Sequence, residues 1–175
     1  MISSKGSLYN NLESTKAPSF IAKAMPRKKF VYDYPRPAVA VDLVILTRQI
    51  KPRVLLVRRK HEPFAGKWAL PGGFVDMEET LEAAARRELF EETGIRAGKL
   101  RQLGAFGDPG RDPRGRVISV VYLAEVNPGA VKPHAADDAA AVGWFSLQRP
   151  PQLAFDHRAI LALARRLFVV QRRSS

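Results

Sequence analysis

The sequence predicts an α/β fold, an α/β/α sandwich around a mixed β-sheet. Three observations indicate this class. Apolar, β-rich runs lie in both halves of the chain, a helical pattern rich in carboxylates stands between them, and an amphipathic helical pattern follows the last run. Strands and helices in this order form a sheet covered by helices. A chain of 175 residues is long enough to enclose one such core.

Composition agrees with a globular protein and excludes several kinds of site. Hydrophobic residues make up 46% and charged residues 26%, which is the balance of a soluble domain. The chain has no cysteine, so it has no disulfide framework, zinc-thiolate site or cysteine nucleophile. This absence favours a cytoplasmic location. No apolar run approaches the length of a membrane span, so we expect no membrane partner.

The net charge of +12 permits attraction to polyanions and leaves two interpretations open. The basic surface can serve anionic nucleotide substrates and solubility, or it can bind nucleic acid. No basic motif is interleaved with aromatic residues, and the basic residues are spread along the chain. We therefore favour a small nucleotide over a nucleic acid as the ligand.

Residues 1–30 are predicted to be a flexible N-terminal arm, and residues 31–175 a single domain. The arm is rich in Ser, Asn and Lys and has no clear periodicity. It lacks the apolar core of a secretory signal, but it is basic and poor in acids, so an organelle-targeting role stays open. Residues 30–37 contain two prolines and are expected to be extended.

Runs of β-branched and other apolar residues predict the strands. They cover residues 38–46, 53–59, 100–106, 117–126 and 141–147. The first two runs should pair as a hairpin. Near the end of the chain, apolar residues at helical spacing predict an amphipathic helix that covers one face of the domain. These residues are Ile160, Leu161, Leu163, Ala164, Leu167 and Phe168.

The stretch from Trp68 to Ile95 predicts a strand, a glycine turn and a helix. Two consecutive glycines after Pro71 let the backbone turn sharply and approach a ligand closely. Asp76 and Glu79 make a capping box, so the helix is expected to begin at Asp76. A left-handed cap at Gly94 should end it. The apolar stripe of this helix consists of Leu81, Ala84, Ala85 and Leu89.

Carboxylates gather on one part of this helix. Glu88 and Glu92 are four residues apart and share a face, with Glu91 beside them, and like charges at this spacing repel. A hard divalent cation would reverse that cost, and ligands that are all oxygen suit magnesium or manganese. Arg87 can pair with Glu91 at i,i+4. The alternative is a solvated, charged helix face without a metal.

The fixed positions of this stretch carry a resemblance to a known family. They match every restricted position of the Nudix box: Gly73, Glu79, Arg87, Glu88, Leu89, Glu91, Glu92, Gly94 and Ile95. The chain therefore resembles Nudix hydrolases, which cleave nucleoside diphosphates linked to another group. The resemblance implies magnesium, or manganese, held mainly by Glu88 and Glu92, with Glu91 and the carbonyl of Gly72 assisting.

The segment GDPGRDPRGR, residues 107–116, has too many Gly and Pro residues for regular structure. On composition alone it can be a long polar hairpin loop. Followed by its strand, it is similar to the same segment of ADP-ribose pyrophosphatases and of relatives that sense NAD metabolites. The resemblance implies hydrolysis of ADP-ribose to AMP and ribose 5-phosphate. The candidates for contacts with phosphate or ribose are Arg36, Arg59, Arg111 and Arg114.

The resemblance leaves the general base open. It can be a glutamate of the box, Glu91 or Glu92, or an acid from a later loop such as Asp138, because related ADP-ribose hydrolases often take a catalytic acid from there. Asp137 and Asp138 can instead cap a neighbouring element. His157, near the start of the last helix, is expected to be structural.

Other functions stay open. The substrate can be another nucleoside diphosphate derivative, such as a dinucleotide polyphosphate, or a nucleoside triphosphate. An ADP-ribose sensor is a second class, but similar regulators carry a further winged-helix region, for which a sequence that ends at Ser175 leaves no room. An RNA-directed Nudix protein is a third. Related hydrolases are frequently dimers that exchange their N-terminal segments, so we expect a homodimer.

Overall fold

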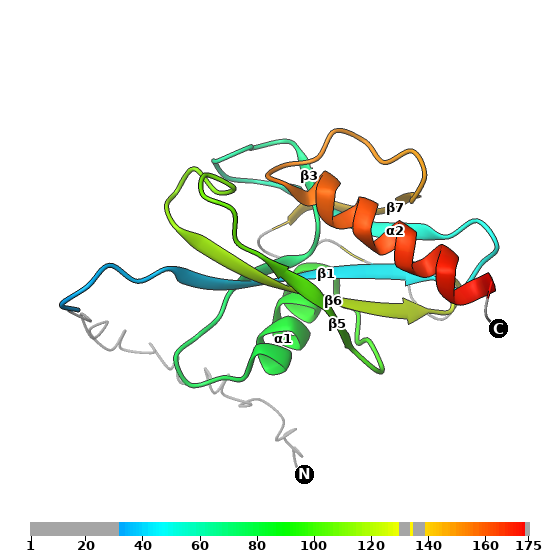
Figure 1. The fold of residues 1–175 in the computed structure, drawn as a ribbon. Coiled ribbons are helices and arrows are strands. Elements are labelled where there is room, and N and C mark those ends of the chain that lie inside the picture. Colours follow the sequence, from blue (N-terminus) through cyan, green and yellow to red (C-terminus); the bar gives the residue numbers. More distant parts are fainter. Residues whose placement is uncertain (1–31, 130–133, 135–138, 174–175) are drawn as a thin grey trace, which may run out of the picture. The chain divides into compact units, whose positions relative to one another are not determined.

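The computed structural model describes residues 32–129, 134 and 139–173 (Figure 1). The strands and helices lie within the unit Tyr34–Ser175. In chain order they are β1 (Ala38–Thr47), β2 (Arg53–Arg59), β3 (Trp68–Ala69), β4 (Gly72–Phe74), α1 (Leu81–Thr93), β5 (Arg101–Phe106), β6 (Val117–Val126), β7 (Ala139–Ser146) and α2 (His157–Arg173). The five predicted strands are confirmed to within two residues at each end. The predicted arm, residues 1–30, lies outside the described residues.

The sheet is mixed, as predicted. β1 runs parallel to β6 along its whole length, from the pair Ala38–Val117 to the pair Thr47–Val126. β5 is antiparallel to β6, and β4 is antiparallel to β1. β2 forms the predicted hairpin with β1 and also pairs with β3 and β7. The two long central strands therefore hold the short strand β4 at a fixed place beside β1.

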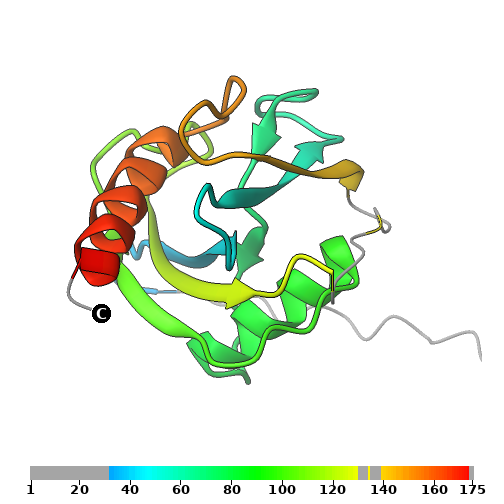
Figure 2. The ribbon, with the colours of Figure 1, turned by 90° about the vertical axis from the view of Figure 1, so that its right-hand side faces the viewer.

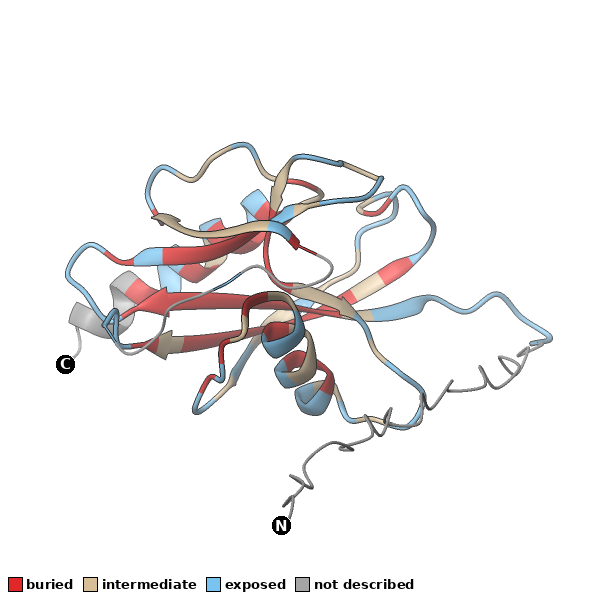
Figure 3. Cartoon of the chain, turned by 180° about the vertical axis from the view of Figure 1, so that it is seen from behind, coloured by how far each residue is buried: buried red, intermediate tan, exposed pale blue. Residues whose placement is uncertain are grey.

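Alternation along β1 divides its side chains between two cores, because successive residues of a strand point to opposite faces. Val41, Leu43 and Ile45 pack in one core with the apolar face of α1. Val44 and Leu46 pack in the other core with α2. Figure 2 shows the two helices on opposite sides of the strands, and Figure 3 shows the buried residues concentrated between these layers. The predicted α/β/α sandwich is thus confirmed.

The apolar pattern of the last helix is confirmed for most of its members. Ile160, Leu161, Ala164 and Phe168 are buried against the sheet. Two large side chains of the pattern are exceptions, because Leu163 is half-buried and Leu167 is 38% exposed. No helix in the described ranges is long and apolar enough to cross a lipid bilayer.

The predicted start of the first helix at Asp76 is wrong, because α1 begins at Leu81. Thr80 is the N-cap, and its hydroxyl accepts a hydrogen bond from the backbone N–H of Ala83 at 3.2 Å. The Asp76–Glu79 contact exists, since the Glu79 carboxylate accepts from the Asp76 N–H at 2.9 Å, but it closes a turn ahead of the helix. The predicted cap at Gly94 is confirmed, with a φ of 69°.

Candidate active site

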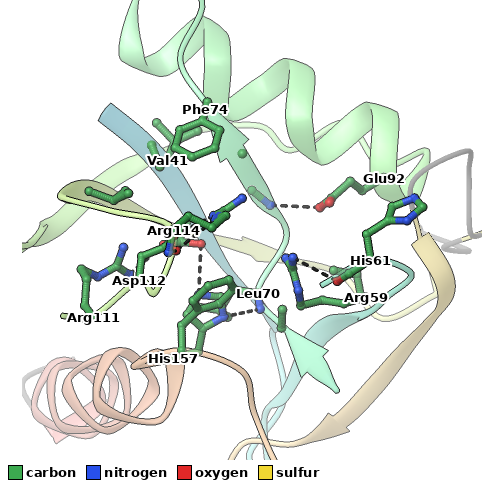
Figure 4. Close-up of a pocket in the computed structure, with 18 of the residues that line it drawn as sticks. Val41, Arg59, His61, Leu70, Phe74, Glu92, Arg111, Asp112, Arg114 and His157 are labelled. Carbon is green, nitrogen blue, oxygen red and sulfur yellow. Dashed lines mark hydrogen bonds and ion pairs between the residues drawn. The ribbon is translucent and has the colours of Figure 1, made fainter. Parts of the chain in front are cut away.

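A cavity of about 270 Å³ opens where β4 passes between β1 and the end of α1 (Figure 4). Two groups of predicted residues are defined by their relation to it, and of the acidic group Glu92 lines the cavity whereas Glu88 and Glu91 are not among its lining residues. We call Glu88, Glu91 and Glu92 of α1 the acidic side. We call Arg59, Arg111 and Arg114 the arginine side; all three arginines line the cavity. The fold thus brings together residues that are separated by more than fifty positions in the chain.

Glu92 lines the cavity at the glycine turn. The backbone N–H of Gly72 donates a hydrogen bond of 3.0 Å to its Oε2 atom, as Figure 4 shows. Burial raises the pKa of Glu92 to about 8, and the charges of Glu88 and Asp42 act in the same direction, against Gly72 and Arg59. In the described ranges, no basic side chain forms an ion pair with Glu92 within 4.0 Å. Glu92 is therefore a largely buried acid that lacks a cation.

Arg87 forms ion pairs with Glu79, which lies ahead of α1, and with Glu88 and Glu91 of α1. Its guanidinium lies 2.6 Å from Glu79, 2.8 Å from Glu88 and 3.0 Å from Glu91, which includes the i,i+4 pair expected from the sequence. Hydrogen bonds from Arg87 lower the pKa of Glu79. Burial raises the pKa of Glu88 against the opposing effect of Arg87. Arg87 thus holds Glu79, Glu88 and Glu91 in place. Among the ion pairs of the described residues, it makes none with Glu92.

Two glycines allow these groups to come close to the strand. A Cβ atom at Gly73 would lie 2.3 Å from the Oε1 atom of Glu88, and one at Gly72 would lie 2.1 Å from the carbonyl oxygen of Val41. Both distances are far below van der Waals contact. Gly72 also has a φ of 153°. A side chain at Gly72 would meet the backbone of β1, so this position has to be glycine, whereas a side chain at Gly73 would force the Glu88 carboxylate to move.

The donors of the acidic side suit a hard divalent cation. They are carboxylate and carbonyl oxygens, and buried Glu92 has no cationic partner in the described ranges. The described residues contain no group of three or more acidic or histidine side chains arranged to hold a metal ion. The ligand roles predicted for Gly72, Glu88, Glu91 and Glu92 therefore stay predictions, and the chemistry of these groups fits them.

Arg111 is held in a buried ion pair. Its Nε and Nη2 atoms donate to the carboxylate of Asp156 at 2.8 and 2.7 Å, and Asp42 lies 3.5 Å away. The Arg111 side chain is only 4% exposed. Burial lowers the pKa of Arg111, but the hydrogen bonds to Asp156 outweigh that effect and raise it. Arg111 therefore joins the 107–116 loop to the residues just ahead of α2.

Arg114 forms a second fixed pair. It donates to the carboxylate of Asp112 from Nε at 3.0 Å, from Nη2 at 2.7 Å and from its backbone N–H at 2.9 Å. The Asp112 side chain is 2% exposed, and that of Arg114 is 42% exposed. Burial raises the pKa of Asp112, but the hydrogen bonds from Arg114 outweigh burial, so its pKa lies below the ordinary value. The guanidinium lies over the rings of Phe74 and Phe155, 4.7 and 5.5 Å from their centroids.

Arg59 differs from the other two arginines. Its guanidinium donates to the carbonyl oxygens of Pro63 at 2.8 Å and His61 at 3.4 Å. Burial lowers the pKa of Arg59, and the positive charge of Arg114 adds to this. In the described part of the chain, no carboxylate lies within ion-pair distance of it. Arg59 is therefore the arginine of this side whose charge is least compensated.

The remaining predicted site residues fall elsewhere. Arg36 is exposed just ahead of β1 and is not among the residues that line the cavity. Asp137 and Asp138 lie outside the described residues, so the predictions for them stay predictions.

Sequence reasoning missed a buried polar network in the wall of the cavity, which Asp42 and His157 both line. Asp42 accepts a short hydrogen bond from the hydroxyl of Ser119, and Nε2 of His157 lies 3.4 Å from it. The other ring nitrogen, Nδ1 of His157, accepts the backbone N–H of Leu70 at 2.9 Å. The expectation that His157 is structural agrees with this geometry. Asp42 itself could have indicated this network, because it is a charged residue inside the apolar strand AVAVDLVIL.

Comparison with known proteins decides the family. The model of the NUDIX domain matches residues 36–164. The chain belongs to the Nudix family. The glycine turn and the acidic helix both lie within the residues that the family model matches.

Several relatives of this Nudix chain have names that refer to ADP-ribose. An ADP-ribose pyrophosphatase of Methanocaldococcus jannaschii is 44% identical over 151 residues, 86% of each chain. The ADPR responsive transcriptional repressor NtrR of Acinetobacter baylyi is 39% identical over 137 residues, and the match spans 75% of this chain and 54% of the repressor. Among solved structures, the NUDIX domain of Shewanella oneidensis NrtR complexed with ADP ribose matches with a TM-score of 0.69 and 34% identity, over 77% of this chain and 90% of that one.

Proposed function

We propose that this Nudix hydrolase cleaves the diphosphate of ADP-ribose to AMP and ribose 5-phosphate with the help of magnesium or manganese. The observation that carries the proposal is Glu92, a half-buried carboxylate with no ion-pair partner in the described ranges, at a glycine turn in a cavity that is also lined by arginines. The 44% identity to an ADP-ribose pyrophosphatase over most of both chains supports the choice of substrate.

Hydrolysis adds one water across the diphosphate. The water oxygen bonds to one phosphorus while the bond from that phosphorus to the bridging oxygen breaks, so each product keeps one phosphate. A divalent cation held by Glu88 and Glu92, with Glu91 and the Gly72 carbonyl assisting, would neutralise the negative charge of the diphosphate. Every other contribution comes from the residues of the chain.

Arg59 is the arginine best suited to bind the diphosphate, because its guanidinium contacts the carbonyl oxygens of Pro63 and His61 and the Phe155 ring but forms no ion pair with a carboxylate in the described ranges. Arg111 and Arg114 are ion-paired, and they hold the 107–116 loop in place along the cavity. Arg36, exposed and away from the cavity lining, is the weakest of the predicted substrate contacts.

The proton of the attacking water passes to a carboxylate. Glu92 is our first choice, since its carboxylate lines the cavity and accepts the backbone N–H of Gly72 at the glycine turn. Glu91 is 56% exposed and bound to Arg87, which makes it a weaker candidate. Asp138 remains a candidate from the sequence resemblance alone.

A second function has specific support. The similar repressor of Acinetobacter baylyi is named as responsive to ADPR, and the matching Shewanella structure contains ADP ribose. A domain that binds ADP-ribose without cleaving it would use the same cavity. The complete set of box carboxylates favours hydrolysis, because a site that only binds has no need of every one of them.

We also propose that the protein is a cytoplasmic homodimer. The lack of cysteine supports the location. The exposed residues 32–37 before β1 are compatible with the exchange between subunits that the sequence resemblance implies. Sedimentation at micromolar concentration should give a dimer, and a monomer would contradict this part of the proposal.

Release of AMP from a panel of compounds tests the proposed reaction. The panel contains ADP-ribose, NADH, a diadenosine polyphosphate and nucleoside triphosphates, each with magnesium and then with a chelator. We expect ADP-ribose to be cleaved fastest and only with metal. Faster cleavage of another compound would mean that this compound, and not ADP-ribose, is the substrate. Binding of ADP-ribose without any turnover would favour the function of an ADP-ribose sensor.

A further inference from the structure

Phe74 is an exposed aromatic residue at the edge of the cavity. It is the last residue of β4, directly after the two glycines of the turn, and it lines the cavity. Its side chain stays 42% exposed, although a phenylalanine is normally buried. Figure 4 shows Phe74 on the opposite side of Arg114 from His157 and Leu70.

The guanidinium of Arg114 packs against the Phe74 ring. It lies over the ring at 4.7 Å from the centroid, which is within the range of a cation–π contact. Hydrogen bonds from its Nε and Nη2 atoms to the carboxylate of Asp112 hold the guanidinium in one orientation. Phe74 is therefore a flat surface with a fixed cation behind it.

A ligand cannot take the place of Arg114 without a large penalty. Asp112 is 2% exposed, and losing its partner would leave a buried carboxylate unpaired. A planar ligand group has to bind to the exposed part of the Phe74 ring while Arg114 stays in position. The stack of Phe74 on Arg114 is thus preorganised.

The spacing along β4 fits a nucleotide. Phe74 is two residues beyond Gly72, and a strand advances about 3.3 Å per residue, so the two lie roughly 7 Å apart. This is about the span of the ribose that separates a phosphate from its base. A diphosphate beside Gly72 and Glu92 would bring the attached base to Phe74.

We propose that Phe74, backed by Arg114, is the stacking site for the nucleobase of the substrate. The proposal deepens the proposed function, because it rests on a nucleoside diphosphate bound in this cavity. A base has a π-face that stacks on an aromatic ring, and each such stack strengthens binding by about 5-fold or more. Phe74 would then select nucleotides over sugar diphosphates that have no base.

The chain contains a matched control for this stack. Phe90 of α1 is 43% exposed, and the guanidinium of Arg96 lies over its ring at 4.1 Å. The Phe90–Arg96 pair has the same composition and exposure as the Phe74–Arg114 pair. Neither of its residues is among those that line the cavity.

Binding of 1,N6-ethenoadenosine monophosphate to the purified full chain tests the proposal. This fluorescent analogue of AMP has a base but no diphosphate, so its binding does not depend on hydrolysis. We expect Phe74→Leu to weaken its binding about 10-fold. Phe74→Tyr should bind as the wild type does, because it keeps the ring, and Phe90→Leu should be unaffected. Circular dichroism checks that each variant is folded.

Kinetics with ADP-ribose give the second readout. Phe74→Leu should raise KM about 10-fold and leave kcat within about 2-fold. Competition by ribose 5-phosphate, which lacks a base, should be unchanged by the substitution. Equal weakening of ribose 5-phosphate would show that Phe74 contacts the sugar and would overturn the proposal.

The outcomes separate this proposal from the proposed reaction. If Phe74→Leu binds the fluorescent nucleotide as tightly as the wild type, the base site is wrong even where ADP-ribose is hydrolysed. If the wild type does not bind the nucleotide at all, the base site is wrong as well. If binding of the fluorescent nucleotide depends on Phe74 but no ADP-ribose is cleaved, the proposed base site is supported and the proposed hydrolysis is wrong.

Discussion

The acidic side and the arginine side of the cavity differ in how far the protein neutralises its own charges. Arg111 and Arg114 each make several hydrogen bonds to one buried or half-buried aspartate. Glu92 accepts a single backbone N–H, and burial raises its pKa to about 8. The arginine side is therefore largely complete within the chain, whereas the acidic side gains most from a cation that comes from solution.

This difference assigns separate tasks to the two sides. A buried charge with a full set of hydrogen bonds keeps the surrounding backbone in one conformation. A buried acid without a cation is poised to bind one, because the cation restores its charged form. We infer that the arginine side holds the shape of the cavity and that the acidic side carries out the chemistry. Four substitutions test this assignment.

The largest expected effect is that of Glu92→Gln on turnover. The substitution keeps the shape of the side chain and removes the charge that a cation and a base both require, so turnover of ADP-ribose should fall about 100-fold or more. The fold should persist, since Gln can still accept the Gly72 N–H. Steady-state kinetics and circular dichroism on the same preparation measure both. Normal turnover by the folded variant would mean that Glu92 is not in the active site.

Arg111→Met should act on stability. Removal of the guanidinium leaves Asp156 and Asp42 without their shared partner, and breaking a buried ion pair costs about 3–5 kcal/mol of unfolding free energy. Urea denaturation measures the loss. The matched control is Glu82→Gln, which breaks an exposed pair with Arg86 and should cost less than about 1 kcal/mol. Equal small losses in both variants would show that Arg111 does not hold the loop.

His157 should make the stability depend on pH. Burial lowers its pKa below the ordinary 6.5, against the charges of Asp42 and Asp156 and together with those of Arg111 and Arg59. The unfolded chain therefore binds a proton below pH 6.5 that the folded chain does not bind, and protonation of Nδ1 would break its bond to Leu70. The contribution of His157 is complete above this pH, and stability falls by up to about 1.4 kcal/mol per pH unit below it.

The variant His157→Asn isolates this effect. Asparagine can accept the Leu70 N–H but does not titrate, so the difference in unfolding free energy between wild type and variant should shrink from about pH 7.5 to about pH 5.5. Urea titrations at the two pH values give this difference. A constant difference would mean that His157 is not held in its neutral form.

Glu91→Gln is expected to have the smallest effect. Glu91 is 56% exposed, and its pair with Arg87 is an i,i+4 surface contact that contributes about 0.5 kcal/mol or less. Turnover should fall much less than in Glu92→Gln, in the same assay. A loss as large as that of Glu92→Gln would show that the exposed carboxylate is as important as the buried one.

The sequence predicted those features that depend on local pattern. Apolar runs predicted the strands, helical spacing predicted the covering helix α2, and the spacing of the box located Glu92 and the glycine turn. The start of α1 was predicted four or five residues too early, because the side chains of Thr80 and Asp76 offer competing caps and only the fold selects one.

The roles of the arginines could not be read from the sequence. Arg111 and Arg114 stand in a segment rich in Gly and Arg, as phosphate-binding arginines can. The structure pairs Arg111 with Asp156, 45 positions away, and Arg114 with Asp112, two positions away. The contact of Phe74 with Arg114 also depends on how β4 and the loop meet. Such contacts arise from tertiary structure, so sequence alone could give them only as candidates.

Metal binding measured by thermal unfolding tests most directly whether a cation completes the acidic side. The wild-type chain is unfolded with a chelator and with excess magnesium or manganese, and Glu92→Gln is treated in the same way. At a metal concentration about 100 times the Kd, the folded state should gain about 2.7 kcal/mol, which raises Tm by several degrees. The account predicts this rise for the wild type and little or none for Glu92→Gln. No rise in the wild type, or an equal rise in both proteins, would contradict it.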